Sequence, residues 1–77
     1  MSRITLNSGQ VFEIRPVTGV LHVYEVRALQ DGRRRVGFIQ MSPLCLIPNR
    51  SDTASSLLLL EEIYGRATAD GVIPLRS

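Results

Sequence analysis

The sequence is poor in residues that build cofactor sites, because it has one cysteine, one histidine and no lysine. The single cysteine, Cys45, excludes an intrachain disulfide and a thiolate metal cage. The single histidine, His22, excludes a pair of histidine ligands, and no carboxylate or cysteine stands beside it at a ligand-like spacing. We therefore expect no metal and no other cofactor, and we interpret His22 as a partly buried structural residue.

Long hydrophobic runs are also absent. The longest apolar run is the four leucines at 57–60, whereas a membrane-spanning helix needs about 20 apolar residues. The first residues alternate in polarity and lack the apolar segment of a secretory signal. These absences predict a protein without membrane association, located in the cytoplasm.

Catalytic motifs are missing as well. The sequence contains no phosphate-binding loop, no nucleophile elbow and no Cys-x-x-Cys pair. Glu61 and Glu62 are adjacent on a predicted helix and diverge by about 100°, so they cannot converge on one substrate atom. Glu13 and Glu25 fall on predicted strands, where we expect them to face solvent, and capping or turns explain the aspartates. We therefore predict that the protein is not an enzyme.

The composition is that of one small folded domain. Of the 77 residues, 44% are hydrophobic and 21% are charged, a balance typical of folded proteins. A domain of this size buries only about 60% of the surface of its unfolded chain, so the core is thin. Self-association would supplement such a core, and a homodimer is therefore one of the expected states.

All nine basic residues are arginine. Codon choice in a GC-rich genome produces this bias, which indicates a bacterial or phage coding sequence. The alternative explanation is functional, because a guanidinium forms paired hydrogen bonds with carboxylates and phosphates that an ammonium group cannot form. The bias by itself therefore identifies no partner.

A first β-hairpin is predicted over residues 3–15, where apolar and polar residues alternate around a turn. A three-residue loop would place Ile4 opposite Ile14 and Leu6 opposite Phe12. The apolar side chains then share one face of the hairpin, which is the face that we expect to enter the core.

A second hairpin is predicted over residues 20–41, turning at Asp31 and Gly32. Asp-Gly between two alternating runs is the strongest short-range hairpin signal, because a two-residue turn needs residues that tolerate positive φ. In this register Val26 lies opposite Gly37, whereas a three-residue loop would shift the second strand and exchange its faces. The predicted core face contains Val20, His22, Tyr24, Val26, Ile39 and Met41.

Three arginines, Arg33, Arg34 and Arg35, follow this turn directly. Side chains alternate along a strand, so we expect Arg33 and Arg35 on one face and Arg34 on the other, near Arg27. Arginines divided in this way would grip an acidic partner from both sides of a projecting ribbon. The same cluster would also neutralise the phosphates of a nucleic acid.

A helix is predicted over residues 53–64, with Ser51 or Asp52 as its N-cap and Gly65 just beyond its end. Leu58 falls on the polar side of this helix. It is either a single exposed apolar residue, which is common, or a contact for a partner.

Two further segments contain prolines. Residues 43–50 are predicted to be an extended connector, and residues 67–77 are predicted to be an extended tail or an edge strand. The apolar residues of the tail either fold back on the chain's own sheet or cross to a second subunit. These residues are Val72, Ile73 and Leu75.

The sequence thus predicts a single α+β domain over residues 1–77, with a four-stranded antiparallel sheet of two hairpins packed against one C-terminal helix. We predict a small protein-interaction module, such as the inhibitors, adaptors or oligomeric subunits that phages and mobile elements encode. The alternative is a nucleic-acid-binding protein that uses the arginine-rich hairpin. The candidate partner-binding residues are Arg27, Arg33, Arg34, Arg35 and Leu58, and the candidates for a dimer interface are Val72, Ile73 and Leu75.

Overall fold

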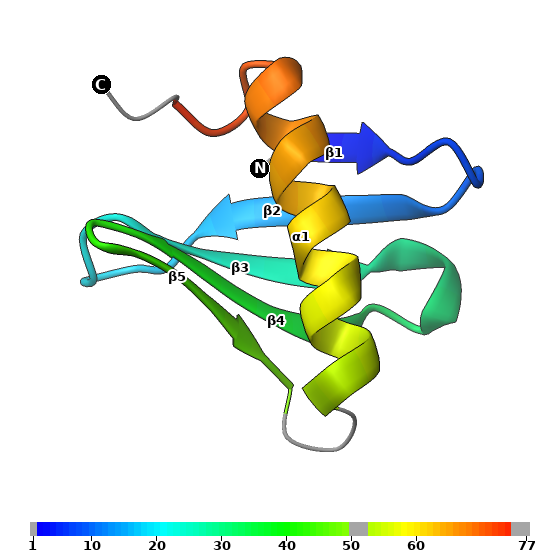
Figure 1. The fold of residues 1–77 in the computed structure, drawn as a ribbon, viewed down its shortest axis with the longest axis horizontal. Helices are drawn as coiled ribbons and strands as arrows, with labels where there is room; N and C mark the ends of the chain where they lie inside the picture. Colours follow the sequence, from blue (N-terminus) through cyan, green and yellow to red (C-terminus); the bar gives the residue numbers. More distant parts are fainter. Residues whose placement is uncertain (1, 50–52, 75–77) are drawn as a thin grey trace.

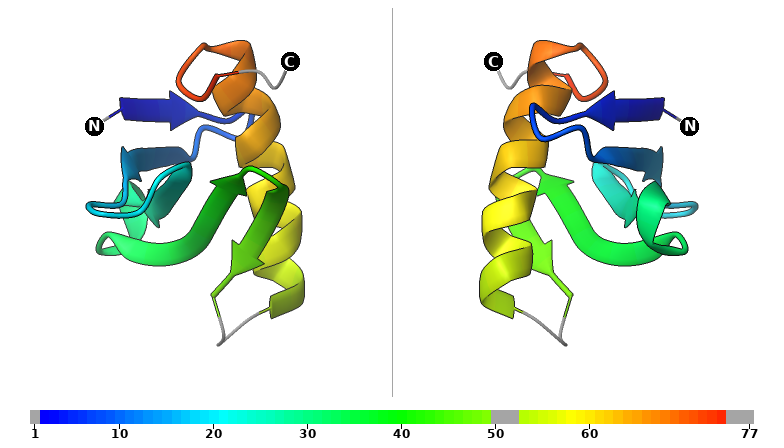
Figure 2. Two further views of the ribbon diagram at one scale, coloured as in Figure 1. Left: turned by 90° about the vertical axis from the view of Figure 1, so that its left-hand side faces the viewer. Right: turned by 90° about the vertical axis from the view of Figure 1, so that its right-hand side faces the viewer.

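The computed structural model describes residues 2–49 and 53–74 and shows a five-stranded antiparallel sheet crossed on one face by a helix (Figure 1). Each strand pairs with the next along the chain, so the sheet is a meander. Figure 2 shows that the sheet is strongly curved and that the helix lies along one side of it. The elements are β1 (Ser2–Thr5), β2 (Val11–Pro16), β3 (Val23–Ala28), the 3-10 helix η1 (Leu29–Asp31), β4 (Arg34–Met41), β5 (Leu44–Pro48) and α1 (Thr53–Ala69).

The predicted α+β fold, with an antiparallel sheet and one C-terminal helix, is confirmed, but the predicted number of four strands is wrong. The fifth strand, β5, forms from the segment 43–50 that was expected to be a connector. It pairs with β4 from Met41 opposite Leu44 to Gly37 opposite Pro48. Pro48 is tolerated because β5 is an edge strand, which needs hydrogen-bond donors on one side only.

The hairpin of β1 and β2 has the predicted faces but a different register. Ile4 lies opposite Phe12 rather than Ile14, because the three-residue turn begins at Asn7, one residue earlier than the predicted pairing requires, and Leu6 N–H donates to the carbonyl of Gln10 across it. A register difference of two residues leaves every side chain on its original face. Ile4, Phe12 and Ile14 are therefore all buried in the core, as predicted.

The hairpin of β3 and β4 follows the predicted register as far as a β-bulge. Val26 lies opposite Gly37, as predicted, but the next pair is Arg27 opposite Arg35, so Val36 is an extra residue in β4. An extra residue in one strand exchanges the sheet faces to which the side chains beyond it project. As a result Val36 is fully buried in the core.

The turn between β3 and β4 is wider than the predicted Asp-Gly pair. It consists of η1 followed by Gly32 and Arg33, which both have left-handed backbone conformations with φ of 63° and 60°. The sequence signal therefore located the turn correctly but not its length. At the other end of the hairpin, β3 begins only at Val23, so the placement of Val20 and His22 in the core face is wrong and both are exposed.

Helix α1 continues beyond its predicted end. Gly65 remains helical, and the helix ends instead at Ala69, two residues before Gly71, which has a φ of 74°. There the N–H of Val72 donates to the carbonyl of Ala67 and the N–H of Gly71 donates to that of Thr68, which are the two bonds of a Schellman motif. The candidate N-caps, Ser51 and Asp52, lie outside the described residues.

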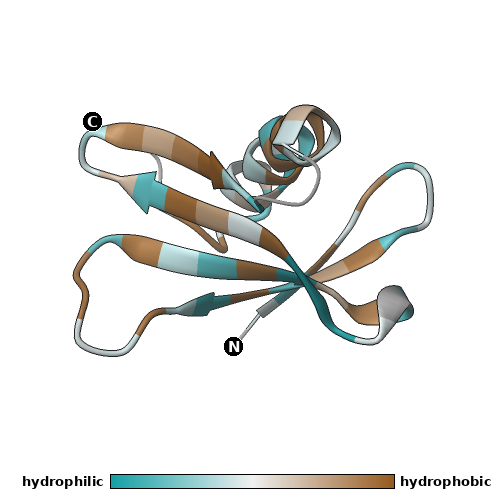
Figure 3. Cartoon of the chain, turned by 90° about the horizontal axis from the view of Figure 1, so that it is seen from below, coloured by the Kyte–Doolittle hydropathy of each residue, from teal (hydrophilic) through white to brown (hydrophobic). Residues whose placement is uncertain are grey.

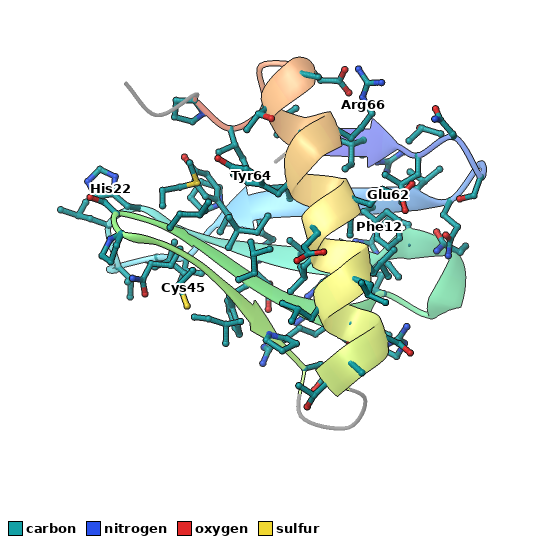
Figure 4. All side chains as sticks on the ribbon, viewed as in Figure 1. Phe12, His22, Cys45, Glu62, Tyr64 and Arg66 are labelled. Atoms are coloured by element: carbon teal, nitrogen blue, oxygen red, sulfur yellow. The ribbon has the colours of Figure 1, made fainter. Side chains whose placement is uncertain are left out.

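One hydrophobic core fills the space between α1 and the sheet, and Figure 4 shows Phe12 beneath the helix. Gly37 allows the helix to approach β4 closely. A Cβ atom at this position would lie 2.3 Å from the carbonyl oxygen of Ile47 and 2.9 Å from Cδ1 of Leu60. The buried apolar residues are Ile4, Leu6, Phe12, Ile14, Val26, Ala28, Val36, Ile39, Met41, Leu60, Ile63, Ala67 and Ile73.

Candidate binding face

The sheet face opposite α1 carries a concentration of arginines. In an antiparallel sheet, residues that lie directly opposite one another project from the same face. The pairings therefore align two rows across the sheet, and we call their arginines, together with the adjoining Arg33, the arginine face. The first row is Arg3, Glu13, Arg27 and Arg35, and the second is Arg15, Glu25, Phe38 and Ile47.

Glu13 lies in the middle of the arginine face and is fully buried. Arg33 donates from Nη1 to Glu13 Oε2 at 3.4 Å, and Arg15 Nη1 lies 4.0 Å from Glu13 Oε1. Oε1 itself accepts no hydrogen bond. The expectation that Glu13 faces solvent is wrong, because η1 packs beside β2 and Arg33 reaches over the carboxylate.

Glu25, in the second row, is also buried rather than exposed to solvent. Arg27 donates to both of its oxygens at 3.2 Å, and Arg35 Nε donates to Oε2 at 2.9 Å. Burial raises the pKa of Glu25, but the hydrogen bonds and charges of Arg27 and Arg35 outweigh this effect and hold the pKa below its ordinary value of 4.5. Glu25 is therefore a carboxylate at neutral pH and anchors two guanidiniums.

The turn after β3 positions Arg33 over Glu13. Gln30 Oε1 accepts a hydrogen bond from Val11 N–H at 3.1 Å, which ties the turn to β2. Arg27 Nη1 donates to the carbonyl oxygen of Arg33 at 2.9 Å. These two bonds hold Arg33 in its left-handed conformation, a region that residues with a Cβ rarely occupy.

The bulge at Val36 decides which arginines share a face. It places Arg35 opposite Arg27 and beside Glu25, whereas Arg34 lies opposite Ala28 on the side of the sheet that faces α1. The prediction that Arg34 lies near Arg27, with Arg35 on the opposite face, is therefore wrong. In Figure 3 the strongly hydrophilic start of β4 marks this run of arginines.

Sequence reasoning missed three residues of this face, Arg3, Arg15 and Phe38. Arg35 lies over the ring of Phe38, with its guanidinium carbon 5.0 Å from the ring centre, a cation–π geometry. The alternation of Glu13 with Arg15 and of Glu25 with Arg27 was the available signal. It places acidic and basic side chains on the same face of β2 and β3, so that each neutralises the other across the strands.

The other candidates that the structure describes, Leu58, Val72 and Ile73, belong to α1 and to the segment that follows it. Leu58 is 69% exposed on α1, as expected for a residue on its polar side. Of the candidates for a dimer interface, Ile73 is fully buried in the chain's own core and Val72 packs against that core, so these two residues fold back on their own domain. The third, Leu75, lies outside the described residues.

No family model, curated protein or solved structure matches this chain. Among the described residues, three or more His, Cys, Asp or Glu side chains nowhere gather in a way that could hold a metal ion. Over the same residues, no helix has the length and apolar character needed to cross a membrane. Figure 4 shows His22 in the loop before β3 and Cys45 on β5, and both are exposed.

Proposed function

We propose that the protein is a non-enzymatic protein-interaction module that binds an acidic surface of a partner protein through the arginine face. The observation that carries this proposal is the excess of positive charge on a sheet face that α1 does not cover. Five arginines lie there with two glutamates, and both carboxylates are buried. The exposed acidic residues Glu61 and Glu62 lie on α1, away from this face.

The fixed geometry of the arginines favours recognition of carboxylates. Arg27 donates to Glu25 and to the carbonyl of Arg33, and Arg35 donates to Glu25, so neither side chain moves freely before binding. Ordering a long side chain costs about 0.5–1.5 kcal/mol on association, and a side chain that is already held loses less. Arginine is also enriched at protein interfaces, where its guanidinium pairs with carboxylates through two parallel hydrogen bonds.

A second candidate function is nucleic-acid binding, and Phe38 is the observation that favours it. A partly exposed aromatic ring beside several arginines is the arrangement that stacks a base while guanidiniums hold the phosphates. Phe38 is the only aromatic residue in the two rows, so this candidate has one stacking position. We rank it below protein binding for that reason.

Capture of a partner from host extract on the immobilised protein tests both candidates. We compare wild type with the double variant Arg3→Gln/Arg15→Gln, with and without nuclease, over a salt series. Arg34→Gln is the matched control, because it removes an equal charge per substitution from the other side of the sheet. A nuclease-resistant protein that wild type and Arg34→Gln retain and the double variant loses would support the proposal.

Two results would count against it. A partner released by nuclease, with binding that falls steeply as salt rises, would favour the nucleic-acid candidate. Partner binding that survives Arg3→Gln/Arg15→Gln would show that the arginine face is structural only. Circular dichroism of each variant establishes that its fold is intact before the comparison is made.

A further inference from the structure

Two depressions flank Phe38 on the arginine face and share Phe38 and Arg35 as walls. Each has a volume of about 260 Å³, which is below the range of about 300–1,000 Å³ usual for small-molecule sites. They are therefore of a size for single side chains. The first is also lined by Arg15, Pro16, Val17, Thr18 and Glu25, and the second by Gly37, Ile47, Pro48 and Asn49.

The two arginines beside the first depression retain unused hydrogen-bond donors. Arg35 donates to Glu25 through Nε, and its other contact is the stacking on Phe38. Among the described residues, Arg15 is held by two ion pairs, at 3.8 Å from Glu25 and 4.0 Å from Glu13. The Nη groups of both side chains can therefore donate hydrogen bonds to a further anion at the same place.

We propose that this pair of depressions binds an acidic peptide segment with an apolar residue next to its acidic one. The acidic side chain lies between Arg15 and Arg35, and the apolar neighbour packs on Phe38 and on Ile47 and Pro48 in the second depression. This inference rests on the proposed function. It specifies the ligand as an acidic peptide and the binding site as the two depressions beside Phe38.

Charge and wall chemistry favour a peptide over a nucleic acid at this site. The carboxylate of Glu25 is 3.8 Å from Arg15 and hydrogen-bonded to Arg35, so it offsets part of the positive charge of the first depression. A single carboxylate suits that reduced charge. The second depression has aliphatic walls at Ile47 and Pro48, and Phe38 is its one aromatic wall, so a second base would find no further ring on which to stack.

Fluorescence anisotropy with labelled peptides tests the inference on the full chain. The probe is a short peptide with a Glu-Leu-Glu centre, compared with Gln-Leu-Gln, Glu-Gly-Glu and oligothymidylate. We expect Glu-Leu-Glu to bind best, and Arg15→Gln to weaken its binding about tenfold, the effect of losing a hydrogen bond to a charged group. Phe38→Thr is expected to remove the preference for Glu-Leu-Glu over Glu-Gly-Glu.

Arg3→Gln is the control that separates this inference from the proposed function. Arg3 lies on the same face but lines neither depression. If Arg3→Gln weakens peptide binding as much as Arg15→Gln, the face acts as a diffuse positive surface, and the inference fails while the proposed function stands. If oligothymidylate binds best, or if no acidic peptide binds wild type, both are overturned.

Discussion

The two faces of the sheet are built from the same strands but are held in different ways. On the face toward α1, apolar side chains interlock with the helix, and Leu60 and Ile63 are completely buried. The arginine face is not covered by α1, and there Glu13 and Glu25 are buried by arginine side chains that remain partly exposed themselves. The first face is therefore held by apolar packing, and the second is held by ion pairs at the protein surface.

This difference separates stability from recognition. Burial of apolar surface is the main favourable term in folding, whereas partly exposed ion pairs contribute little net free energy. The helix-covered face therefore provides most of the free energy of folding. The arginine face can carry binding groups whose replacement leaves the domain folded, and four substitutions test that separation.

The largest effect is expected for Leu60→Ala on the helix-covered face. Deleting a fully buried leucine side chain leaves a cavity and lowers the free energy of unfolding by about 2–5 kcal/mol. Leu58→Ala, in the same helix, is the matched control, because Leu58 is exposed and its change stays within about 0.5 kcal/mol. Urea denaturation followed by circular dichroism measures both. Equal losses would mean that α1 does not pack as described.

A smaller but still large loss is expected for Gly37→Ala. The added Cβ would meet the carbonyl oxygen of Ile47 at 2.3 Å, so β5 or α1 must move. Overpacking of this kind costs about 1–3 kcal/mol, measured by the same urea denaturation. Gly65→Ala is the control, since a Cβ at Gly65 meets nothing within 4 Å and the residue is helical. A neutral Gly37→Ala would contradict the close approach of α1 to β4.

The third effect is a dependence of stability on pH that comes from the arginine face. The pKa of Glu25 is lower in the folded protein than its ordinary value of 4.5. Its stabilising contribution is therefore complete above about pH 4.5, falls as the pH drops further, and is lost below the folded pKa. Urea denaturation from neutral to acidic pH should show less acid sensitivity for Glu25→Gln than for wild type. Equal sensitivity would mean that Glu25 is not the anchor of Arg27 and Arg35.

The smallest effect on stability is expected for Arg15→Gln. Arg15 is about half exposed, and its ion pairs at 3.8–4.0 Å are screened by solvent, so the free energy of unfolding should change by less than about 1 kcal/mol. Thermal denaturation measures this change, and the same sample serves for peptide binding. If Arg15→Gln is strongly destabilised, the arginine face contributes to folding stability, and the proposed separation of stability from recognition is wrong.

Much of the helix-covered face could be predicted from the sequence, because a register error of two residues leaves each apolar side chain on the same face of the sheet. Ile4 and Phe12 were assigned to the core although their pairing was wrong by two residues. The arginine face could not be predicted in the same way. Its composition depends on one bulged residue, Val36, and strict alternation has no means of anticipating a bulge. The burial of Glu13 was unpredictable for a related reason, since it depends on the conformation of the turn at Arg33.

The fifth strand was missed because local rules treat prolines as interruptions. Pro43 and Pro48 bound the segment, and a connector is the usual interpretation of such spacing. Whether a segment lies at the edge of a sheet is a property of the whole fold. That information is absent from the segment itself.

The bulge at Val36 also has a consequence for how this protein can change over generations. Loss of the Val36 codon would restore strict alternation in β4 and would still leave Arg35 opposite Arg27 and Arg34 opposite Ala28. The cost of such a deletion would fall on the core, because Val36 is fully buried. The charge pattern of the hairpin is therefore compatible with strands of β4 that differ by one residue in length.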